Sequence, residues 1–238
     1  MNKYQIITDP QILQDFMYYI LPKLGQDECF YGCLFARSKY AKNEDGTNQF
    51  PHIKSDKSQL KRFTISKIEH LPQKLRQLEV EIGAYTTKDG DPVPQQALAS
   101  YISVNARSQK KAVWAMMKRL LSLVETEAHG FNIHQEALSA IQQSRSETTY
   151  NIFDLDTKDP SEVGLAAQLV NHEACLWLET RGGYHLLIKP QLVSEPYRRT
   201  YYREIQALPF VDSDAGNDIM IPIPGTFQGG FTPHFITV

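Results

Sequence analysis

The chain has 238 residues, of which 42% are hydrophobic and 22% charged, and its formal net charge is −2. This length suffices for one large domain or two small ones, and the composition is that of a globular protein. No apolar run approaches the roughly 18 residues that a membrane helix needs, and the N-terminal residues lack the apolar core of a signal peptide. The three cysteines argue against a disulfide framework. We therefore expect a cytoplasmic protein that makes no membrane contact.

The patterning of apolar residues and turn signals predicts the elements of the first 145 residues. In chain order these are a helix over 9–24, strands over 29–40 and 60–65, a helix over 68–78, strands over 80–85 and 101–104, and helices over 108–127 and 133–144. In the helix over 108–127 the apolar residues recur at helical spacing and predict its packing face: Val113, Met116, Met117, Leu120, Leu121 and Val124. Lys110, Lys111, Lys118 and Arg119 are expected on the outer face.

Charge is distributed unevenly along this first part of the chain. Residues 37–76 hold ten Lys or Arg and four Asp or Glu, an excess of six positive charges that leaves −8 for the rest of the chain. A basic segment of this kind suits contact with a polyanion, although solvated surface lysines would give the same pattern. The candidate nucleic-acid-binding residues are Arg37, Lys39, Lys57, Lys61 and Arg62.

An Asp-x-Asp pair lies at the C-terminal end of the next predicted strand, in the stretch over residues 150–157. Asp154 and Asp156 are two residues apart, so in a strand their side chains point the same way. Two bare carboxylates there would repel each other and lose solvation, and a divalent cation would relieve both costs. Oxygen-only ligands favour Mg²⁺ or Mn²⁺, and a pair of such ions is a common device in phosphoryl transfer. The alternative is that the pair only caps the helix predicted over 160–170.

A glycine turn joins two further predicted strands, over 176–178 and 184–188. The turn has the sequence Thr180-Arg181-Gly182-Gly183, and His185 follows it. The glycine pair permits positive φ and lets backbone amides approach a ligand closely. Thr180, Arg181 and His185 would gather donors there, as a phosphate or triphosphate requires. The alternative is a plain hairpin in which His185 is an ordinary strand residue.

A third acidic block follows a helix predicted over 196–207. It contains Asp212, Asp214 and Asp218 before a strand over 219–223 that runs into Pro224-Gly225-Thr226. We choose Asp212 as the third metal ligand because an apolar pair precedes it directly and places it at a strand end. Asp214 and Asp218 flank Gly216-Asn217, a strong turn signal, but either one could replace Asp212.

Together these elements predict an α/β fold of the α+β class. The order over residues 146–238 is close to the ferredoxin or RNA-recognition arrangement, with a mainly antiparallel sheet. We expect this half to be catalytic and to follow a basic α/β half over residues 1–145 that contacts nucleic acid.

The three blocks, in order, resemble the motifs of the archaeo-eukaryotic primase superfamily, which includes the primase-polymerases. They are Asp154-Leu155-Asp156, then the turn that ends in His185, then Asp212 with the strand and Pro-Gly-Thr turn behind it. The resemblance covers roughly residues 148–230, with 29 residues from Asp156 to His185 and 27 from there to Asp212. One departure is that many members carry a basic residue or histidine in the last strand, whereas residues 218–222 have none.

The resemblance implies a metal-dependent nucleotidyltransfer reaction, a primase or primase-polymerase that makes or extends primers on single-stranded DNA. It implies that the two halves form one primase-like domain. Asp154, Asp156 and Asp212 would hold two Mg²⁺ or Mn²⁺ ions. His185, with Thr180, Arg181, Gly182 and Gly183, would bind the nucleoside triphosphate. A replicative helicase or another replication protein would be a partner.

Three alternatives have a different chemistry. A rolling-circle initiator or relaxase uses a related sheet with a tyrosine nucleophile, for which Tyr197 and Tyr201 are candidates, but the chain has no His-x-His metal pair. A replication accessory protein that binds single strands would need only the basic segment and exposed aromatic residues. A metal-dependent nuclease would use the same carboxylates for hydrolysis.

Overall fold

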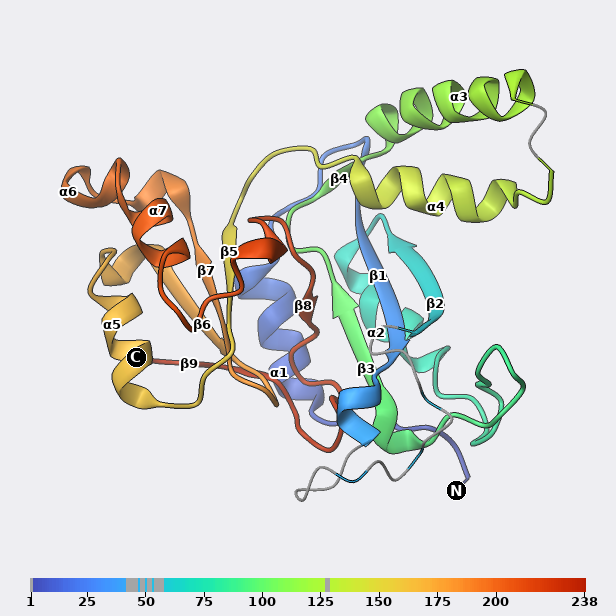
Figure 1. Cartoon of the computed structure of the whole chain (residues 1–238), viewed down its shortest axis with the longest axis horizontal. Coiled ribbons are helices and arrows are strands. Elements are labelled where there is room, and N and C mark those ends of the chain that lie inside the picture. The colour runs from blue at the N-terminus through green and yellow to red at the C-terminus, as the bar shows by residue number, and fades with distance from the viewer. Residues whose placement is uncertain (1, 42–46, 48–49, 51–52, 54–57, 127–128) are drawn as a thin grey trace.

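The computed structural model describes residues 2–41, 47, 50, 53, 58–126 and 129–238 of the chain. Within them the protein has an α+β fold built on two antiparallel sheets that lie next to each other (Figure 1). The predicted fold class is confirmed.

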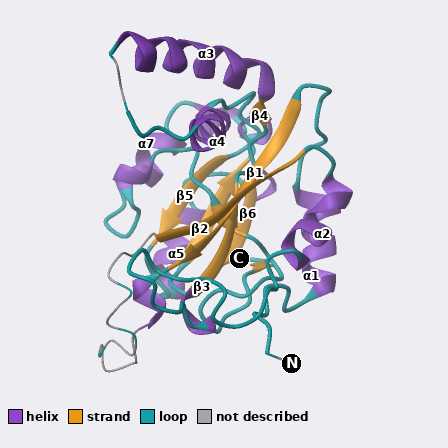
Figure 2. Cartoon of the chain, turned by 90° about the vertical axis from the view of Figure 1, so that its right-hand side faces the viewer, coloured by secondary structure: helices purple, strands orange, loops and turns teal. Residues whose placement is uncertain are grey.

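The first sheet has the order β2-β1-β3-β8, and β4 pairs with one end of β1. Its strands are β1 (Glu28–Ala36), β2 (Ser58–Ile65), β3 (Leu98–Ile102), β4 (Arg107–Ser108) and β8 (Ile221–Pro222). The helices α1 (Pro10–Asp15) and α2 (Leu71–Arg76) lie on the same side of this sheet (Figure 2). Asp9 starts α1 by accepting hydrogen bonds from the amides of Gln11 and Ile12, and the helix continues as one π-helical turn over Phe16–Ile20.

The second sheet has the order β5-β7-β6-β9. Its strands are β5 (Asn151–Leu155), β6 (Cys175–Glu179), β7 (Tyr184–Ile188) and β9 (His234–Ile236). Strand β7 lies between β5 and β6 and runs antiparallel to both, which is the split βαβ arrangement. On the far side of β5 a single bridge joins Leu155 to Val211, in the place of the fourth strand of a ferredoxin-like sheet. The expected RNA-recognition-like order is therefore present, with β9 added at the other edge.

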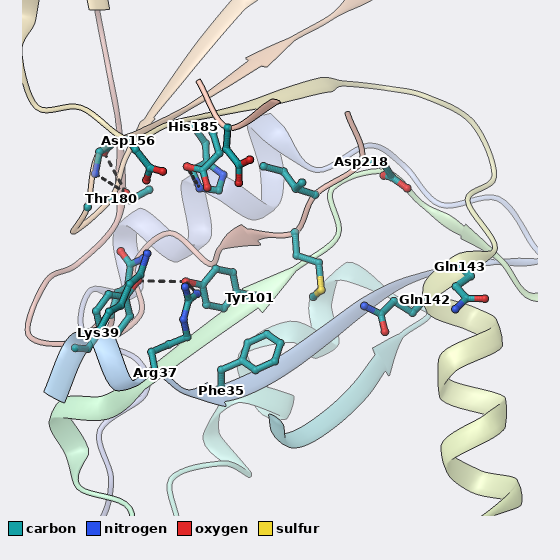
Figure 3. A pocket seen from close by; sticks show the side chains of 18 of the residues that line it. Phe35, Arg37, Lys39, Tyr101, Gln142, Gln143, Asp156, Thr180, His185 and Asp218 are labelled. Atoms are coloured by element: carbon teal, nitrogen blue, oxygen red, sulfur yellow. Dashed lines mark hydrogen bonds and ion pairs between the residues drawn. The ribbon is translucent and has the colours of Figure 1, made fainter. Parts of the chain in front are cut away.

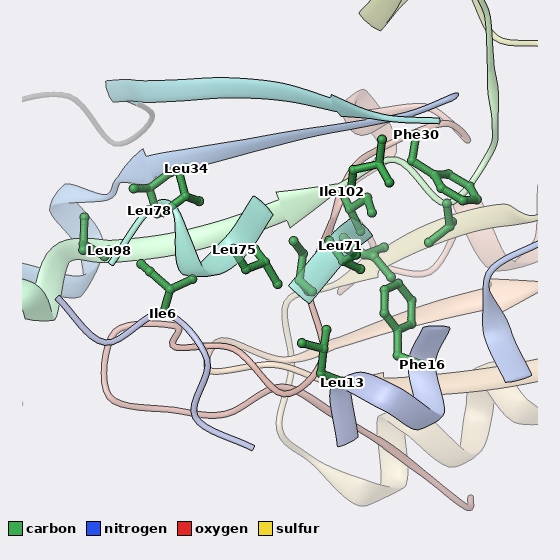
Figure 4. Close-up of a cluster of buried hydrophobic side chains, with 14 of the residues drawn as sticks. Ile6, Leu13, Phe16, Phe30, Leu34, Leu71, Leu75, Leu78, Leu98 and Ile102 are labelled. Carbon is green, nitrogen blue, oxygen red and sulfur yellow. The ribbon is translucent and has the colours of Figure 1, made fainter. Parts of the chain in front are cut away.

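Each face of the second sheet packs against a different layer. On one face Phe153 and Leu186 pack against α5 (Pro160–Ala167) and α7 (Tyr201–Gln206). On the other face Ile152, Leu178 and Leu187 belong to the core that also contains α1, α2 and the first sheet (Figure 4). Side chains alternate along a strand. The residues two positions away from Ile152 in β5 and from Leu187 in β7 therefore also face the first sheet.

The remaining helices complete the chain. They are α3 (Gln109–Glu125), α4 (Ile133–Gln143) and α6 (Glu195–Arg198), with 3₁₀ turns at Ser38–Ala41, Ile68–His70, Gln95–Ala97, His172–Ala174, Pro190–Leu192 and Ser213–Ala215. None of the described helices is long and apolar enough to cross a membrane.

Several sequence expectations differ from the structure. The strands expected over 29–40 and 219–223 are shorter, Glu28–Ala36 and Ile221–Pro222, and the strand expected to end at Asp212 is a single bridge at Val211. The strand expected over 80–85 is a series of turns with one bridge, between Lys3 and Glu81. The helix expected over 196–207 is broken into α6 and α7. The boundary expected at 145/146 does not separate the two sheets, because β8 returns from the second half and pairs with β3 of the first.

The packing face predicted for α3 is only partly buried. Ala112 and Leu123 are buried against α4, and Met116 and Leu120 are partly covered. Val113, Met117, Leu121 and Val124 each expose more than half of their surface. The lysines expected on the outer face are exposed, as predicted.

Candidate functional site

A pocket of about 490 Å³ lies between the two sheets (Figure 3). One wall comes from β5, β7 and the turn before β7, and carries Asp154, Asp156, Thr180 and His185. The opposite wall comes from β1, the turn after it and β3, and carries Arg37, Lys39, Tyr40 and Tyr101. This volume is within the range of about 300–1,000 Å³ that is usual for small-molecule sites.

Strand register accounts for the acidic wall. Asp154 and Asp156 share the face of β5 that carries Ile152, which points toward the first sheet. Asp154 pairs in register with His185 of β7, and Oδ1 of Asp154 lies 3.3 Å from Nε2 of the imidazole. His185 is buried, and its other ring nitrogen, Nδ1, has no partner among the described residues. One buried polar atom of this wall therefore has no hydrogen-bond partner among the described residues.

The structure places Asp212 beside the Asp-x-Asp pair. The bridge between Val211 and Leu155 aligns the two segments, and the amide of Asp212 donates to the carbonyl of Asp154 at 2.9 Å. The carboxylate of Asp212 accepts the amide of Asp214, which fixes its orientation at the start of a 3₁₀ turn. The three candidate ligands thus line one pocket.

The other two acids of the third block are placed differently. Asp218 accepts hydrogen bonds from Arg107 at 2.6 Å and Asn105 at 3.0 Å, and lies toward the end of the pocket away from Asp156 (Figure 3). Asp214 is exposed and does not line the pocket. Of the three candidates, Asp212 has the position nearest to that expected for a third ligand.

The three carboxylates influence one another electrostatically. Loss of solvation, followed by the negative charge of Asp154 and to a lesser degree that of Asp212, raises the pKa of Asp156. Burial alone would raise the pKa of Asp154 as well, but the charge and hydrogen bond of His185 outweigh it, with help from Lys39 and Arg37, and the net pKa is lowered. Asp154 is therefore ionised and paired, whereas Lys39 and His185 only partly offset the burial of Asp156 and the charges of its neighbouring carboxylates.

The donor set is compatible with a hard divalent cation, although the side chains are not gathered around one. No three His, Cys, Asp or Glu side chains in the described part of the chain converge as a metal centre. The donors are nevertheless carboxylate oxygens, which Mg²⁺ and Mn²⁺ prefer, and the raised pKa of Asp156 marks a place where added positive charge would be stabilising.

The glycine turn has a role other than the one its sequence suggests. Neither Gly182 nor Gly183 has a positive φ. The amides of Thr180 and Gly183 bond within the turn, and the amide of Arg181 donates to the side chain of Gln228. Three of the expected phosphate donors are thus already used. Gly183 is instead required for close packing, because an added Cβ would lie 2.0 Å from the carbonyl oxygen of Leu155.

The opposite wall is a network of cations and phenols. Arg37 is buried and donates to the hydroxyl of Tyr101 at 2.6 Å. The hydroxyl of Tyr40 lies 3.2 Å from that of Tyr101 and accepts from Gln228 at 2.7 Å. The guanidinium groups of Arg37 and Arg181 and the ammonium group of Lys39 all lie within 6 Å of the centre of the Tyr40 ring. Three cations therefore surround one tyrosine, and two of them, Arg37 and Lys39, line the pocket across from the carboxylates.

The basic residues predicted to bind nucleic acid fall in two places. Arg37 and Lys39 line the pocket, whereas Lys61 is exposed on the edge strand β2. Arg62 donates to Gln59 and Ser139, so its guanidinium joins β2 to α4 and is less available to a ligand than expected. Lys57 lies outside the described residues.

Sequence reasoning did not single out Tyr40, Tyr101, Arg107 or Gln228, all of which line the pocket. Their partners are remote in sequence: Gln228, for example, bonds Tyr40, 188 residues away. The Gly229-Gly230 pair directly after Gln228 is a local turn signal in the sequence, and both glycines have positive φ in the structure.

The tyrosines considered as nucleophiles lie elsewhere. Tyr201 is buried and its hydroxyl accepts from Asn151 at 2.6 Å, while Tyr197 belongs to a separate short helix. Neither tyrosine lines the pocket. This placement argues against the rolling-circle or relaxase chemistry.

Comparison with known proteins finds no match to a protein-family model, a curated protein or a solved structure. The function is therefore argued from the geometry of the site.

Proposed function

We propose that the chain is a metal-dependent nucleotidyltransferase of the primase or primase-polymerase kind, acting on single-stranded DNA. The observation that carries the proposal is the pocket itself: Asp154, Asp156 and Asp212 line it together, and Arg37 and Lys39 face them from the other sheet. Metal-binding oxygens on one side and cations on the other suit a metal-bound triphosphate. The sequence resemblance to primases, which rests on the same acidic residues and His185, suggests the same chemistry.

In this proposal Asp154, Asp156 and Asp212 hold Mg²⁺ or Mn²⁺, which when bound would neutralise charge on the reacting phosphates. Lys39 and Arg37 attract the triphosphate. His185 keeps Asp154 ionised through their 3.3 Å contact. Thr180, Arg181, Gly182 and Gly183 support the wall of the pocket rather than cradle phosphate through their amides.

The template requires a second surface. The exposed Lys61 lies on the edge strand β2, outside the pocket lining, and is our candidate for contact with the template backbone. Replication inside the cell also implies a cytoplasmic site of action and a helicase or other replication partner. The free thiols of Cys29, Cys33 and Cys175 suit such a reducing compartment.

Two matched lysine variants test this division. Lys39→Gln should weaken binding of a nucleoside triphosphate in the presence of Mn²⁺ and leave the salt dependence of single-stranded DNA binding nearly unchanged. Lys61→Gln should do the opposite and reduce the log–log salt slope by up to about 0.7. Both side chains are exposed, so neither change should disturb folding. If Lys39→Gln bound the triphosphate as tightly as the parent, the assignment of the pocket to a nucleoside triphosphate would be wrong.

A non-enzymatic role as a single-strand-binding replication protein is the second candidate. It is favoured by the finding that no three metal-ligating side chains converge in the described residues. Chelation separates the two functions, because a binding protein of this kind would keep its DNA affinity in EDTA and incorporate no nucleotide. A metal-dependent nuclease would instead shorten a labelled strand under the conditions in which a polymerase extends it.

A further inference from the structure

Helix α3 exposes an apolar stripe that the described residues leave uncovered. Its five large apolar side chains, Val113, Trp114, Met117, Leu121 and Val124, are each between 51% and 72% exposed. Figure 1 shows α3 as the outermost element of the molecule, lying on α4 and away from both sheets. A cluster of this size on a surface helix is typical of an interaction site.

The stripe is separate from the surface that packs on α4. Successive helical residues are about 100° apart, so Val113, Met117, Leu121 and Val124 lie in one narrow sector. Ala112 and Leu123, which are buried against α4, lie roughly 100° to one side of it. The apolar band of α3 is therefore wider than the part that is buried in the described structure.

We propose that α3 is a self-association surface on which two copies of this chain pair antiparallel. Met117 lies at the centre of the stripe, with Val113 four residues before it and Leu121 four residues after it. An antiparallel dyad at Met117 therefore places Val113 of each copy against the partner subunit's Leu121. Such self-complementarity is the requirement of a two-fold interface.

The charges at the ends of the stripe favour the antiparallel direction. Lys110 is exposed at the N-terminal end of α3 and Glu125 is exposed at its C-terminal end. With the dyad at Met117, Lys110 lies within one helical turn of the partner subunit's Glu125. A parallel pair would instead bring like charges together at each end.

The size of the surface implies a weak, reversible dimer. Helix α3 has 17 residues, and a single helix pair of this length falls below the roughly 1,200 Å² of total buried area that marks standard interfaces. Association is therefore expected at micromolar rather than nanomolar concentration. Because the stripe lies outside the pocket, this inference does not depend on the proposed function.

Analytical ultracentrifugation of the full chain over a range of concentrations tests the proposal. The parent should shift from monomer to dimer, and Leu121→Glu should stay monomeric because it places a carboxylate in the apolar stripe. Leu165→Glu is the matched control: this leucine is also more than half exposed, on helix α5, and the variant should dimerise as the parent does.

A charge swap tests the direction of pairing. Lys110→Glu and Glu125→Lys should each weaken the dimer several-fold, and the variant with both changes should recover the affinity of the parent. Circular dichroism checks that the exposed substitutions leave the helices intact. A parent that remains monomeric at every concentration, a dimer insensitive to Leu121→Glu, or a double variant weaker than both single ones would each overturn the proposal.

Discussion

Asp156 is the residue whose environment most clearly conflicts with its charge. Its pKa is raised by lost solvation and by the neighbouring carboxylates, so the ionised form destabilises the folded protein when no cation is present. Asp156→Asn should therefore raise the melting temperature at neutral pH in EDTA, and the gain should shrink as the pH falls through the raised pKa of Asp156. Differential scanning calorimetry at several pH values measures this.

The same variant should respond differently to divalent ions. Mn²⁺ should stabilise the parent and have little effect on Asp156→Asn, because the amide is a poorer ligand than the carboxylate. Glu179 forms an ion pair with Lys158 and is not one of the three proposed metal ligands. Glu179→Gln is therefore a control that should keep the Mn²⁺ effect. A parent with no Mn²⁺-induced stabilisation would contradict the metal assignment.

The contact between His185 and Asp154 sets the protonation of the buried carboxylate. With the histidine removed, burial is opposed only by Lys39 and Arg37, so His185→Ala should raise the pKa of Asp154. In the parent, Asp154 contributes stability above its unfolded pKa, and this contribution disappears as the pH falls through its lowered folded pKa. His185→Ala should therefore lose less stability on acidification than the parent.

Carboxyl NMR titration checks the prediction, with Asp159 as an internal control. The pKa of Asp159 is lowered by hydrogen bonds from Ser161 at the start of α5 and should not change in His185→Ala. If the pKa of Asp154 also stayed unchanged, the histidine would be only a neighbouring strand residue.

Much of the acidic wall could be predicted from the sequence because its information is local. The spacing of Asp154 and Asp156 determines their common face, and the apolar pair before Asp212 contains Val211, whose bridge to Leu155 brings Asp212 beside them. The opposite wall could not be predicted, because Arg37, Tyr101 and Gln228 meet through contacts between segments far apart in the chain.

At the scale of single elements, the turn between β6 and β7 depends on one of its two glycines. A Cβ on Gly183 would approach the backbone of Leu155 at the end of β5 and of Thr157 just after it, whereas a Cβ on Gly182 would meet nothing within 4 Å. Gly183→Ala should destabilise the fold by about 2 kcal/mol or more and displace β5 with its carboxylates. Urea unfolding measures the difference.

Gly182→Ala is the matched control for this prediction. Its surroundings are open and its φ is not positive, so its free energy of unfolding should remain within about 0.5 kcal/mol of the parent value. Equal destabilisation by the two substitutions would show that the turn needs glycine flexibility rather than the close approach of Gly183.

Helix α3 illustrates what periodicity can and cannot predict. The recurrence of apolar residues correctly predicted a helix, but it did not reveal that α4 covers only part of the apolar band. The position of the Gly-Gly turn was likewise predictable. The backbone of Leu155, which leaves no room for a Cβ on Gly183, lies in another strand, so the need for glycine at this position was not.

At the scale of the whole molecule, the two sheets share one core. Leu34 and Ile102 of the first sheet belong to the same hydrophobic cluster as Ile152 and Leu187 of the second, and Ile221 returns from the second half to join it. Composition and element order predicted the fold class, but the sharing of this core depends on the return of β8 to β3, which local patterns do not encode.

A shortened chain tests this shared core. Residues 1–145 alone lack Tyr150, Ile221 and Ile223, so they should not fold cooperatively, whereas the full chain should unfold in one main transition. Circular dichroism with thermal unfolding compares the two. A cooperative transition of the fragment, comparable with that of the parent, would show that the halves are independent domains.

The most direct test of the account is template-dependent incorporation of a labelled nucleotide by the purified chain. The reaction contains a single-stranded template with Mn²⁺ or Mg²⁺, with and without a primer. The parent should incorporate nucleotide and lose this activity in EDTA, and Asp154→Asn and Asp156→Asn should each reduce it by at least about 10³-fold while remaining folded. Incorporation that survives either substitution, or a parent that incorporates none under any of these conditions, would contradict the assignment of the pocket.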